Sequence, residues 1–159
     1  MTKFEDSYIG NLRKKIGKDK IIVPGARAVI RNEKGEVLLI KRKDTGRWGM
    51  PAGAVELGNS VTDTLKREVF EETGLRVISF RPLSVYTDSK YSFEYPNGDK
   101  IQMFALVFLV DEWDGDLVSE TDETSDIGFF SLNDLPDTHE VYLETLEDLK
   151  NFNGELIVK

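Results

Sequence analysis

The stretch of sequence that decides the fold runs from Gly53 to Leu75 and reads GAVELGNSVTDTLKREVFEETGL. Its second half has the spacing of an amphipathic helix, because apolar residues recur there every four positions, at Val61, Leu65 and Val69. Ser60 stands where it can cap this helix, with Asp63 completing a variant of the capping box. Gly74 is well placed to end the helix in the left-handed conformation. The sequence therefore predicts a helix over residues 60–73.

Three glutamates lie on one face of that predicted helix. Glu68, Glu71 and Glu72 occupy positions i, i+3 and i+4, which brings neighbouring side chains within about 6 Å of each other. Their like charges repel, so the cluster costs stability unless something neutralises it, and hard divalent cations bind carboxylate oxygens. Arg67 stands beside the cluster and could hold one carboxylate in a fixed orientation. On these residues alone, a solvated acidic helix face is the alternative interpretation.

The segment before the helix favours a binding site. Residues 49–58 read GMPAGAVELG, and small residues of this kind let the backbone approach a ligand. Segment and helix together resemble the 23-residue Nudix box, whose pattern is G, five residues, E, seven residues, R-E-U-x-E-E-x-G-U, with U aliphatic. The matching positions are Gly53, Arg67, Glu68, Val69, Glu71, Glu72, Gly74 and Leu75. Residues 35–39, 46–53 and 129–136 are similar to the family's flanking strand, lead-in loop and late strand, so the resemblance covers roughly residues 22–136.

The resemblance implies both a fold and an activity. The fold is an α+β, Nudix-type α/β/α sandwich with a mixed sheet, here with an added N-terminal helix. The activity is that of a metal-dependent pyrophosphohydrolase, which cleaves a phosphoanhydride bond in a nucleoside diphosphate linked to another moiety, with Mg²⁺ or Mn²⁺ as cofactor. Arg67 would orient Glu68 or Glu71. The implied metal ligands are Glu68, Glu71, Glu72 and, through its carbonyl, Gly53.

The identity of the general base stays open between the helix and a later loop. Within the helix, Glu68 and Glu72 are both candidates for taking a proton from the attacking water. Many relatives draw the base from a distal loop instead, and Glu120 and Glu123 are the candidates there. Of these two we prefer Glu123, because it stands six residues before Phe129. An ordinary acidic loop is the alternative for both.

Two positions depart from the family pattern. Asn59 stands where the box has its first glutamate, and because an amide carries no charge and cannot act as a base, it could lower the rate or change the metal preference. Ala52 stands where the family often has a glycine, and its methyl group could narrow the backbone approach. The alternative function is therefore a catalytically weak nucleotide-binding or regulatory Nudix-like module. A purely structural or interaction protein is a third possibility, and it would require that all three helix glutamates be solvent-exposed residues without a functional role.

The amino-acid composition limits which classes of protein this chain can belong to. The chain has 159 residues, of which 40% are apolar, and this fits one domain with a real core. A net charge of −8 argues against a protein that coats nucleic acid, although divalent cations can still bridge it to a phosphate. There is no cysteine and one histidine, His139, so a metal site must use mainly oxygen ligands, which suits Mg²⁺ and Mn²⁺.

The cellular setting is predicted from what the sequence lacks. No apolar run is long enough for a membrane span, and the acidic N-terminus is unlike a signal peptide. We therefore expect a cytoplasmic protein whose partner is a small nucleotide-derived substrate, with no nucleic acid polymer and no membrane.

The remaining elements are predicted from periodicity and turns. Residues 4–16 have the pattern of an amphipathic helix ended by Gly17, which could pack on its own domain or form a homodimer contact. It divides the chain into a helix region at 1–20 and a hydrolase domain at 21–159. Asp137 with Glu140 resembles a capping box that opens a second long helix, ending near residue 151. Strands are predicted at 21–31 and 37–40, paired as a hairpin, and at 77–86, 91–95, 101–110 and 127–132, with a turn at 96–99 and an acidic loop at 111–125.

Several aromatic and basic side chains give weaker signals. Trp48 could stack on a base, but packing is the commoner use in such a loop. Arg42 and Arg47 could contact phosphate or be solvated. His139 has no second histidine to pair with and is predicted to be a bystander. Strand packing, not a base sandwich, is predicted for Tyr86, Tyr91, Phe93 and Tyr95.

Overall fold

The computed structural model describes residues 3–159, and residues 1–2 of the N-terminal segment lie outside the described part. The helical elements are η1 (Phe4–Asp6), α1 (Tyr8–Ile16), α2 (Val61–Thr73), η2 (Ser89–Tyr91) and α3 (Glu140–Asn151). The strands are β1 (Ile21–Ile30), β2 (Val37–Arg42), β3 (Trp48–Gly49), β4 (Ala52–Ala54), β5 (Leu75–Tyr86), β6 (Ser92–Glu94), β7 (Lys100–Gly115), β8 (Thr124–Phe130) and β9 (Ile157–Val158). None of the described helices is long and apolar enough to span a membrane.

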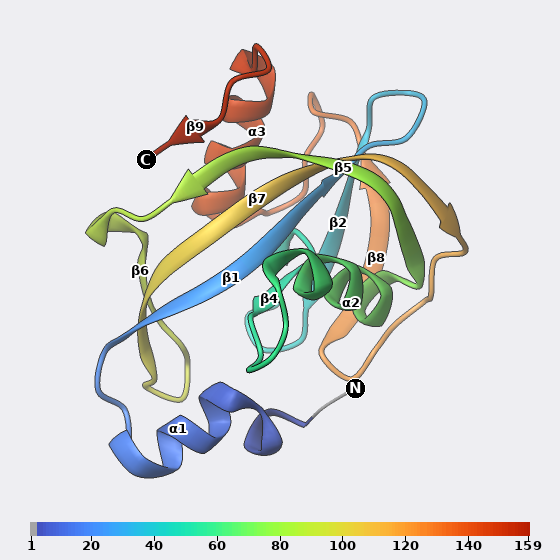
Figure 1. The fold of residues 1–159 in the computed structure, drawn as a ribbon. Coiled ribbons are helices and arrows are strands. Elements are labelled where there is room, and N and C mark those ends of the chain that lie inside the picture. Colours follow the sequence, from blue (N-terminus) through green and yellow to red (C-terminus); the bar gives the residue numbers. More distant parts are fainter. Residues whose placement is uncertain (1–2) are drawn as a thin grey trace.

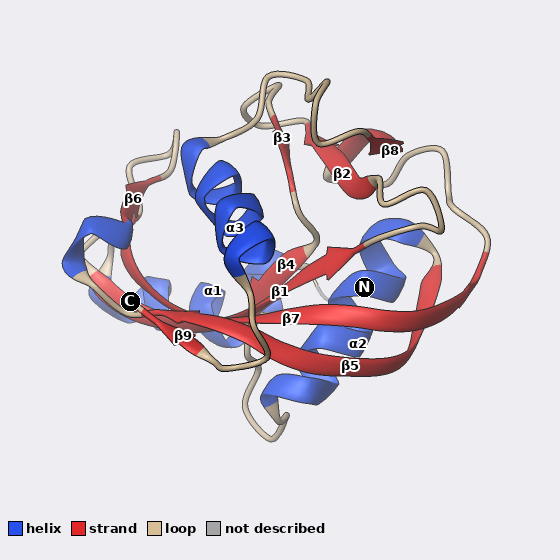
Figure 2. Ribbon diagram, turned by 90° about the horizontal axis from the view of Figure 1, so that it is seen from above, coloured by secondary structure: helices blue, strands red, loops and turns tan. Residues whose placement is uncertain are grey.

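The strands form two sheets between layers of helix. The larger sheet has the order β4-β1-β7-β5-β9, with β6 added along β7, and the smaller has the order β3-β2-β8 (Figure 1). The larger sheet is mixed, because β1 runs parallel to β7 while β5 runs antiparallel to it. Figure 2 shows α3 and the smaller sheet on one side of β1, β7 and β5, with α1 and α2 on the other. The predicted α+β sandwich with a mixed sheet is confirmed.

Two hydrophobic clusters fill the space on either side of the larger sheet. Alternate residues of a strand point to opposite faces, so β1 serves both clusters. Ala28 packs with α2 through Leu65 and Val69. Val29 packs in the other cluster, which Leu146 of α3 completes. This two-sided burial fixes α2 against the sheet, and with it the glutamates that α2 carries.

Helix α2 begins and ends as the sequence predicts. Ser60 accepts a hydrogen bond from the backbone N–H of Asp63, and the Asp63 side chain accepts one from the Ser60 backbone, which completes the capping box. Gly74 ends the helix with φ 82°, in the left-handed region that favours glycine.

The predicted hairpin between the first two strands is wrong. Strand β1 pairs with β7 over ten residues, and within the described chain β1 meets β2 only at the isolated bridge between Arg31 and Val37. The reason is burial. Residues Val37 to Ile40 are all buried, so β2 needs cover on both faces and lies in the centre of the smaller sheet.

Strand β7 extends five residues into the predicted acidic loop. Its acidic end pairs with the start of β5, and cross-strand charge pairs support this pairing: Arg76 with Asp114 at 2.8 Å and Arg81 with Asp111 at 3.2 Å. The sequence showed the acids of β7, but not that the arginines of β5 would face them.

Two predicted helix starts also differ in detail. The N-terminal helix is interrupted at Ser7, whose hydroxyl accepts from the Gly10 N–H, so Phe4 lies on a separate short turn. At α3 the predicted capping box does not form. His139 is the N-cap and makes no side-chain cap, and Arg47 binds both acids instead, at 3.3 Å from Asp137 and 3.2 Å from Glu140.

Candidate active site

A cavity of about 360 Å³ lies against the glutamate face of α2. All three predicted helix glutamates line it, together with Gly53 of β4 and Glu123 from the loop before β8. The structure therefore brings together residues that are up to 70 positions apart in the chain, between Gly53 and Glu123.

Glu68 and Glu72 are both shielded from water, Glu72 more strongly than Glu68. Glu72 is 6% exposed, and the hydrogen bond recorded for its carboxylate comes from the Ala52 backbone N–H at 3.0 Å. The Glu68 side chain is 18% exposed, and its Oε1 accepts from the Arg67 guanidinium at 3.1 Å. Each therefore has little compensation for a buried negative charge.

The pKa values of these carboxyls reflect that burial. The pKa of Glu68 is raised to about 7 by burial and, to a smaller extent, by the nearby Glu71 and Glu123 charges, which together outweigh the lowering by Arg67. Burial also raises the pKa of Glu72 well above its ordinary value, followed by the charge of Glu68, and the Ala52 N–H opposes this only in part. Mutual repulsion of this kind is what carboxylates gathered around one site experience.

Arg67 connects the helix to the loop before it. Its guanidinium donates to the Asn59 side-chain oxygen at 2.5 Å, to the Ala54 carbonyl at 3.2 Å and to Glu68. Asn59, which departs from the family pattern, thus keeps an acceptor for Arg67 while losing the charge. The arrangement holds Glu68 in one orientation.

The register of β4 decides which backbone carbonyl faces the cavity. Gly53 lies opposite Ala26 of β1. Recorded hydrogen bonds flank this pair two residues away on either side, from Ala28 N to Pro51 O and from Val55 N to Pro24 O. Because hydrogen-bonded pairs alternate along an antiparallel ladder, the Gly53 carbonyl points at β1. The polar groups of Ala52 point the other way, and its N–H indeed reaches Glu72.

Gly53 contributes to the site in a different way, because it leaves space for the Glu68 side chain. A Cβ at this position would overlap the Glu68 carboxyl group. The residue therefore allows β4 and the glutamate side of α2 to approach each other closely.

The two candidate bases in the acidic loop lie in different environments. Glu123 lines the cavity, and its charge acts on both Glu68 and Glu72. Glu120 is not among the lining residues and forms an exposed ion pair with Lys43 at 3.6 Å.

The residues fit a divalent metal by the chemistry of their donors. In the described part of the chain, no three His, Cys, Asp or Glu side chains are already arranged to hold a metal ion. The site nevertheless offers an oxygen-only donor set with one buried carboxylate, Glu72, and one partly buried carboxylate, Glu68, and hard cations prefer such a set.

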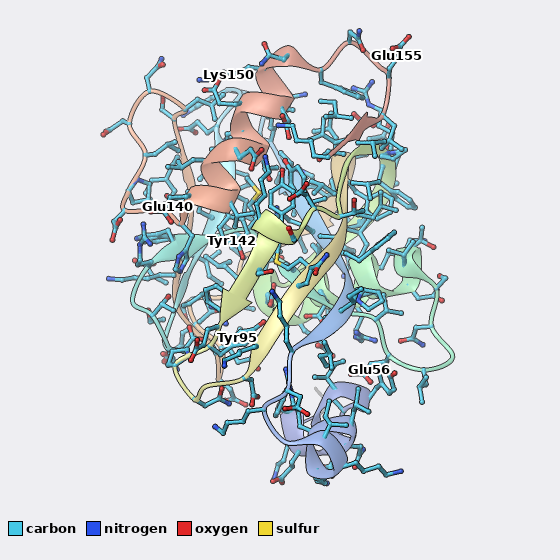
Figure 3. All side chains as sticks on the ribbon, turned by 90° about the vertical axis from the view of Figure 1, so that its left-hand side faces the viewer. Glu56, Tyr95, Glu140, Tyr142, Lys150 and Glu155 are labelled. Carbon is cyan, nitrogen blue, oxygen red and sulfur yellow. The ribbon has the colours of Figure 1, made fainter. Side chains whose placement is uncertain are left out.

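A second cavity of about 240 Å³ adjoins the first and shares Arg42, Tyr95 and Ile101 with it. It is rich in aromatic side chains. Figure 3 shows Tyr142 on α3, at the end that begins with Glu140. The aromatic residues that line this cavity are Tyr91, Phe93, Tyr95, His139 and Tyr142.

The sequence prediction missed this aromatic cavity. Strand packing was predicted for Tyr91, Phe93 and Tyr95, and nothing in the sequence showed that they would line a cavity together with α3. Tyr86 is buried packing, as predicted. Trp48 also packs, edge-on against Phe130 with ring centroids 4.8 Å apart.

The prediction that His139 is a bystander stays a prediction, although the residue belongs to a hydrogen-bond network at the start of α3. Besides lining the cavity, it contacts Arg47 at 3.2 Å through Nδ1 and the Thr45 hydroxyl at 3.2 Å through Nε2. Because the arginine can only donate, Nδ1 accepts and Nε2 carries the proton. Burial, and then the Arg47 charge, lowers the pKa of His139 and supports this neutral form.

Comparison with known proteins decides the family. A model of the NUDIX domain matches residues 22–149, which is most of the chain. The chain belongs to the NUDIX family. An 8-oxo-dGTP diphosphatase from Haemophilus influenzae is 34% identical over 102 residues, covering 62% of this chain and 69% of that protein. An ADP-ribose pyrophosphatase from Methanocaldococcus jannaschii is 36% identical over 104 residues, covering 64% of this chain and 57% of that protein.

A solved NUDIX structure shares the fold over most of the chain. The MutT NUDIX hydrolase from Burkholderia pseudomallei superposes with a TM-score of 0.68 at 30% identity, covering 80% of this chain and 98% of that one. The chain spans about half the length of several curated NUDIX relatives that it matches. Since these relatives differ in the substrates their names give, the family alone does not assign one.

Proposed function

We propose that this protein is a metal-dependent hydrolase that cleaves a phosphoanhydride bond in a nucleoside diphosphate linked to another moiety. The observation that carries the proposal is the convergence of Glu68, Glu71, Glu72 and Glu123 on one cavity. Two of these carboxylates are largely buried with incomplete compensation. Family membership and relatives named as pyrophosphatases and diphosphatases support it.

The metal, Mg²⁺ or Mn²⁺, would be held by the carboxylates of α2. We propose Glu68, Glu71 and Glu72 as side-chain ligands. For the backbone ligand we prefer the Ala52 carbonyl to that of Gly53, because the register turns Gly53 toward β1. A cation bound there would neutralise the bridging phosphates and lower the pKa of a bound water.

The protein side chains would then orient the groups and move the proton. Arg67, fixed by Asn59 and the Ala54 carbonyl, keeps Glu68 directed into the cavity. Glu123 is the proposed general base: it takes a proton from the attacking water as the new P–O bond forms and the bridging P–O bond breaks. Glu123 is exposed and lies on a loop rather than on α2, so it is free to accept that proton.

The aromatic cavity is the proposed place for the nucleoside. Base–aromatic stacking stabilises binding without hydrogen bonding to the base, and Phe93 and Tyr142 supply the faces, since Tyr91 is buried in the core. Arg42 lines both cavities, and its guanidinium, which pairs with Asp44 at 2.7 Å, would share its charge with the phosphates between them.

The test is hydrolysis by the full chain with Mg²⁺ and with Mn²⁺. The substrates would be ADP-ribose, other nucleoside diphosphate conjugates, and ordinary and oxidised nucleoside triphosphates. We expect metal-dependent turnover that Glu72→Gln lowers by more than about 100-fold, since loss even of residues that only support metal ligands costs about 10- to 100-fold. Glu147→Gln is the matched control, because Glu147 is an exposed glutamate on α3 that pairs with Lys150. Binding of nucleotides without any turnover would instead favour a regulatory module.

A further inference from the structure

The carboxylate cavity has a wall that lies outside the NUDIX match. Phe4 of η1 and Ile9 and Arg13 of α1 line the cavity, although the family match begins only at residue 22. The β6–β7 turn continues this wall through Asn97 and Asp99. Figure 1 shows α1 lying below β1 and β4, at the open side of the glutamate cavity.

The wall is fixed to both sides of the cavity. On the side of the box loop, Glu56 lies directly beside α1 (Figure 3), and its Oε2 accepts from the Tyr8 backbone N–H at 2.7 Å. On the hairpin side, Arg13 is 9% exposed and donates to the carbonyls of Asp19 at 2.6 Å and Lys100 at 2.8 Å. Helix α1 is therefore built into the site rather than loosely attached to it.

The chemistry of this wall differs from that of α2. Arg13 and Asp99 largely neutralise each other, with Nε and Oδ2 3.8 Å apart. Phe4 offers an aromatic face and is 56% exposed. Within residues 3–159, neither the Tyr95 hydroxyl nor Oδ1 of Asp99 has a recorded hydrogen-bond partner in this cavity wall. An aromatic face beside a free hydroxyl and a free carboxylate oxygen suits a neutral group that carries hydroxyls, because these groups can both pack and hydrogen-bond it.

The same wall does not suit a further phosphate. Asp99 and Glu56 are both acidic, and Arg13 already donates to three backbone carbonyls, while its buried Nε lies 3.8 Å from Asp99. A phosphate chain that extended from the α2 glutamates toward this wall would meet these carboxylates, while Arg42 of the same cavity is already paired with Asp44 at 2.7 Å.

We propose that η1, α1 and the β6–β7 turn form a subsite for the moiety linked to the diphosphate, and that this subsite selects a neutral, hydroxyl-bearing group of the sugar class over a terminal phosphate. The inference rests on the proposed hydrolase function and adds a specificity determinant from outside the family domain. Phe4 is the residue that contributes most accessible apolar surface to it.

The experiment compares two substrates that share a nucleoside: a nucleoside diphosphate sugar and the matching nucleoside triphosphate. Steady-state kinetics with Mg²⁺ would be measured for the full chain and for Phe4→Ala. We expect Phe4→Ala to lower the ratio of kcat/KM for the sugar conjugate to that for the triphosphate by roughly tenfold, mainly by raising KM for the conjugate. Tyr8→Ala is the matched control, because Tyr8 is an exposed aromatic residue of α1 that does not line the cavity, and it should leave the ratio unchanged.

Each other outcome overturns the subsite in a distinguishable way. An equal loss on both substrates would give Phe4 a structural role only, and thermal melting of the variant would confirm this. No change in either would remove Phe4 from the site while leaving the hydrolase function intact. Hydrolysis of the triphosphate alone by the unaltered chain would reverse the predicted selectivity. Lack of turnover of both substrates would overturn the hydrolase function itself, and the subsite with it.

Discussion

Glu123 and Glu120 are three residues apart in one acidic loop, yet only Glu123 lines the carboxylate cavity. If Glu123 takes the proton from the attacking water, Glu123→Gln should lower kcat by roughly 100-fold or more, with a small change in KM. Glu120→Gln removes only an exposed ion pair with Lys43 and should stay within about twofold of the unaltered protein. Initial-rate kinetics on one substrate would measure both. Equal effects, or a larger effect at Glu120, would return the role of base to α2.

Asn59 poses a second question at the scale of one residue. Its side-chain oxygen already accepts from Arg67, so Asn59→Glu would turn an uncharged acceptor into a charged one. The pair is partly exposed, and we therefore expect a gain in the free energy of unfolding of about 0.2–1 kcal/mol, with kcat/KM changed by less than about threefold. Denaturant titration and kinetics would test this. A rise in turnover above about tenfold would show that a carboxylate at this position takes part in the chemistry.

Single residues also show where sequence reasoning stops. The helical spacing and the box pattern predicted that Glu68, Glu71 and Glu72 share a face. They could not rank the three, because burial of Glu72 depends on Ala52 of β4 lying above it. The same holds for the backbone ligand: the pattern pointed to Gly53, while the strand register favours Ala52. Local spacing determines which residues can meet, whereas tertiary pairing determines which atoms face the site.

At the scale of the element, α2 is held by its N-terminal cap. Ser60→Ala removes the side-chain acceptor for the Asp63 N–H and should lower the free energy of unfolding by about 1 kcal/mol. Since the glutamates lie two turns further along and are fixed by the core, kcat should change little. Ser119→Ala, in an exposed loop, is the control for denaturant titration. A large loss of turnover with unchanged stability would instead mean that the cap positions the glutamates.

Helices, strands and turns could be predicted where the sequence signals for them lie within the same short segment. The start and end of α2 and the turn between β6 and β7 follow from caps and turn residues, and the structure confirms them. The pairing of β1 with β7, about 80 residues away, leaves no local mark. The acidic end of β7 was predicted as a loop because its partner arginines lie on β5. The strands β4 and β9 are two or three residues long and exist only through their neighbours.

At the scale of the whole molecule, the cavity is assembled from parts that no single segment contains. The box supplies the carboxylates, the hairpin and α3 supply the aromatic cavity, and α1 supplies a wall from outside the family match. In the structure, α1 packs against the rest of the same chain. A homodimer contact through α1 stays a prediction. The carboxylates of the site are shielded from water only in the folded state. The free energy of unfolding should therefore change when protons or a divalent cation bind to them.

The last prediction concerns stability as a function of pH and metal. In the unfolded chain Glu68 titrates near its ordinary pKa of 4.5, and in the folded chain its pKa is raised to about 7; that of Glu72 is raised as well. The folded state therefore binds protons more tightly, so this stabilisation is fully present below about pH 4.5 and is lost as the pH rises through about 7. The loss should be on the order of a few kcal/mol without metal.

A divalent cation should replace those protons. Near pH 8, millimolar Mg²⁺ or Mn²⁺ should raise the Tm by several degrees, whereas near pH 5 the protonated carboxyls should bind it weakly and the Tm should hardly move. The acidic net charge also lowers stability at high pH, so Glu72→Gln is needed to isolate the site: it should reduce both the pH-dependent loss and the metal-dependent gain. Glu147→Gln should retain both. Thermal melts across this pH range would measure the effect, and an equal metal response at both pH values, or one that survives Glu72→Gln, would mean that the cation binds elsewhere.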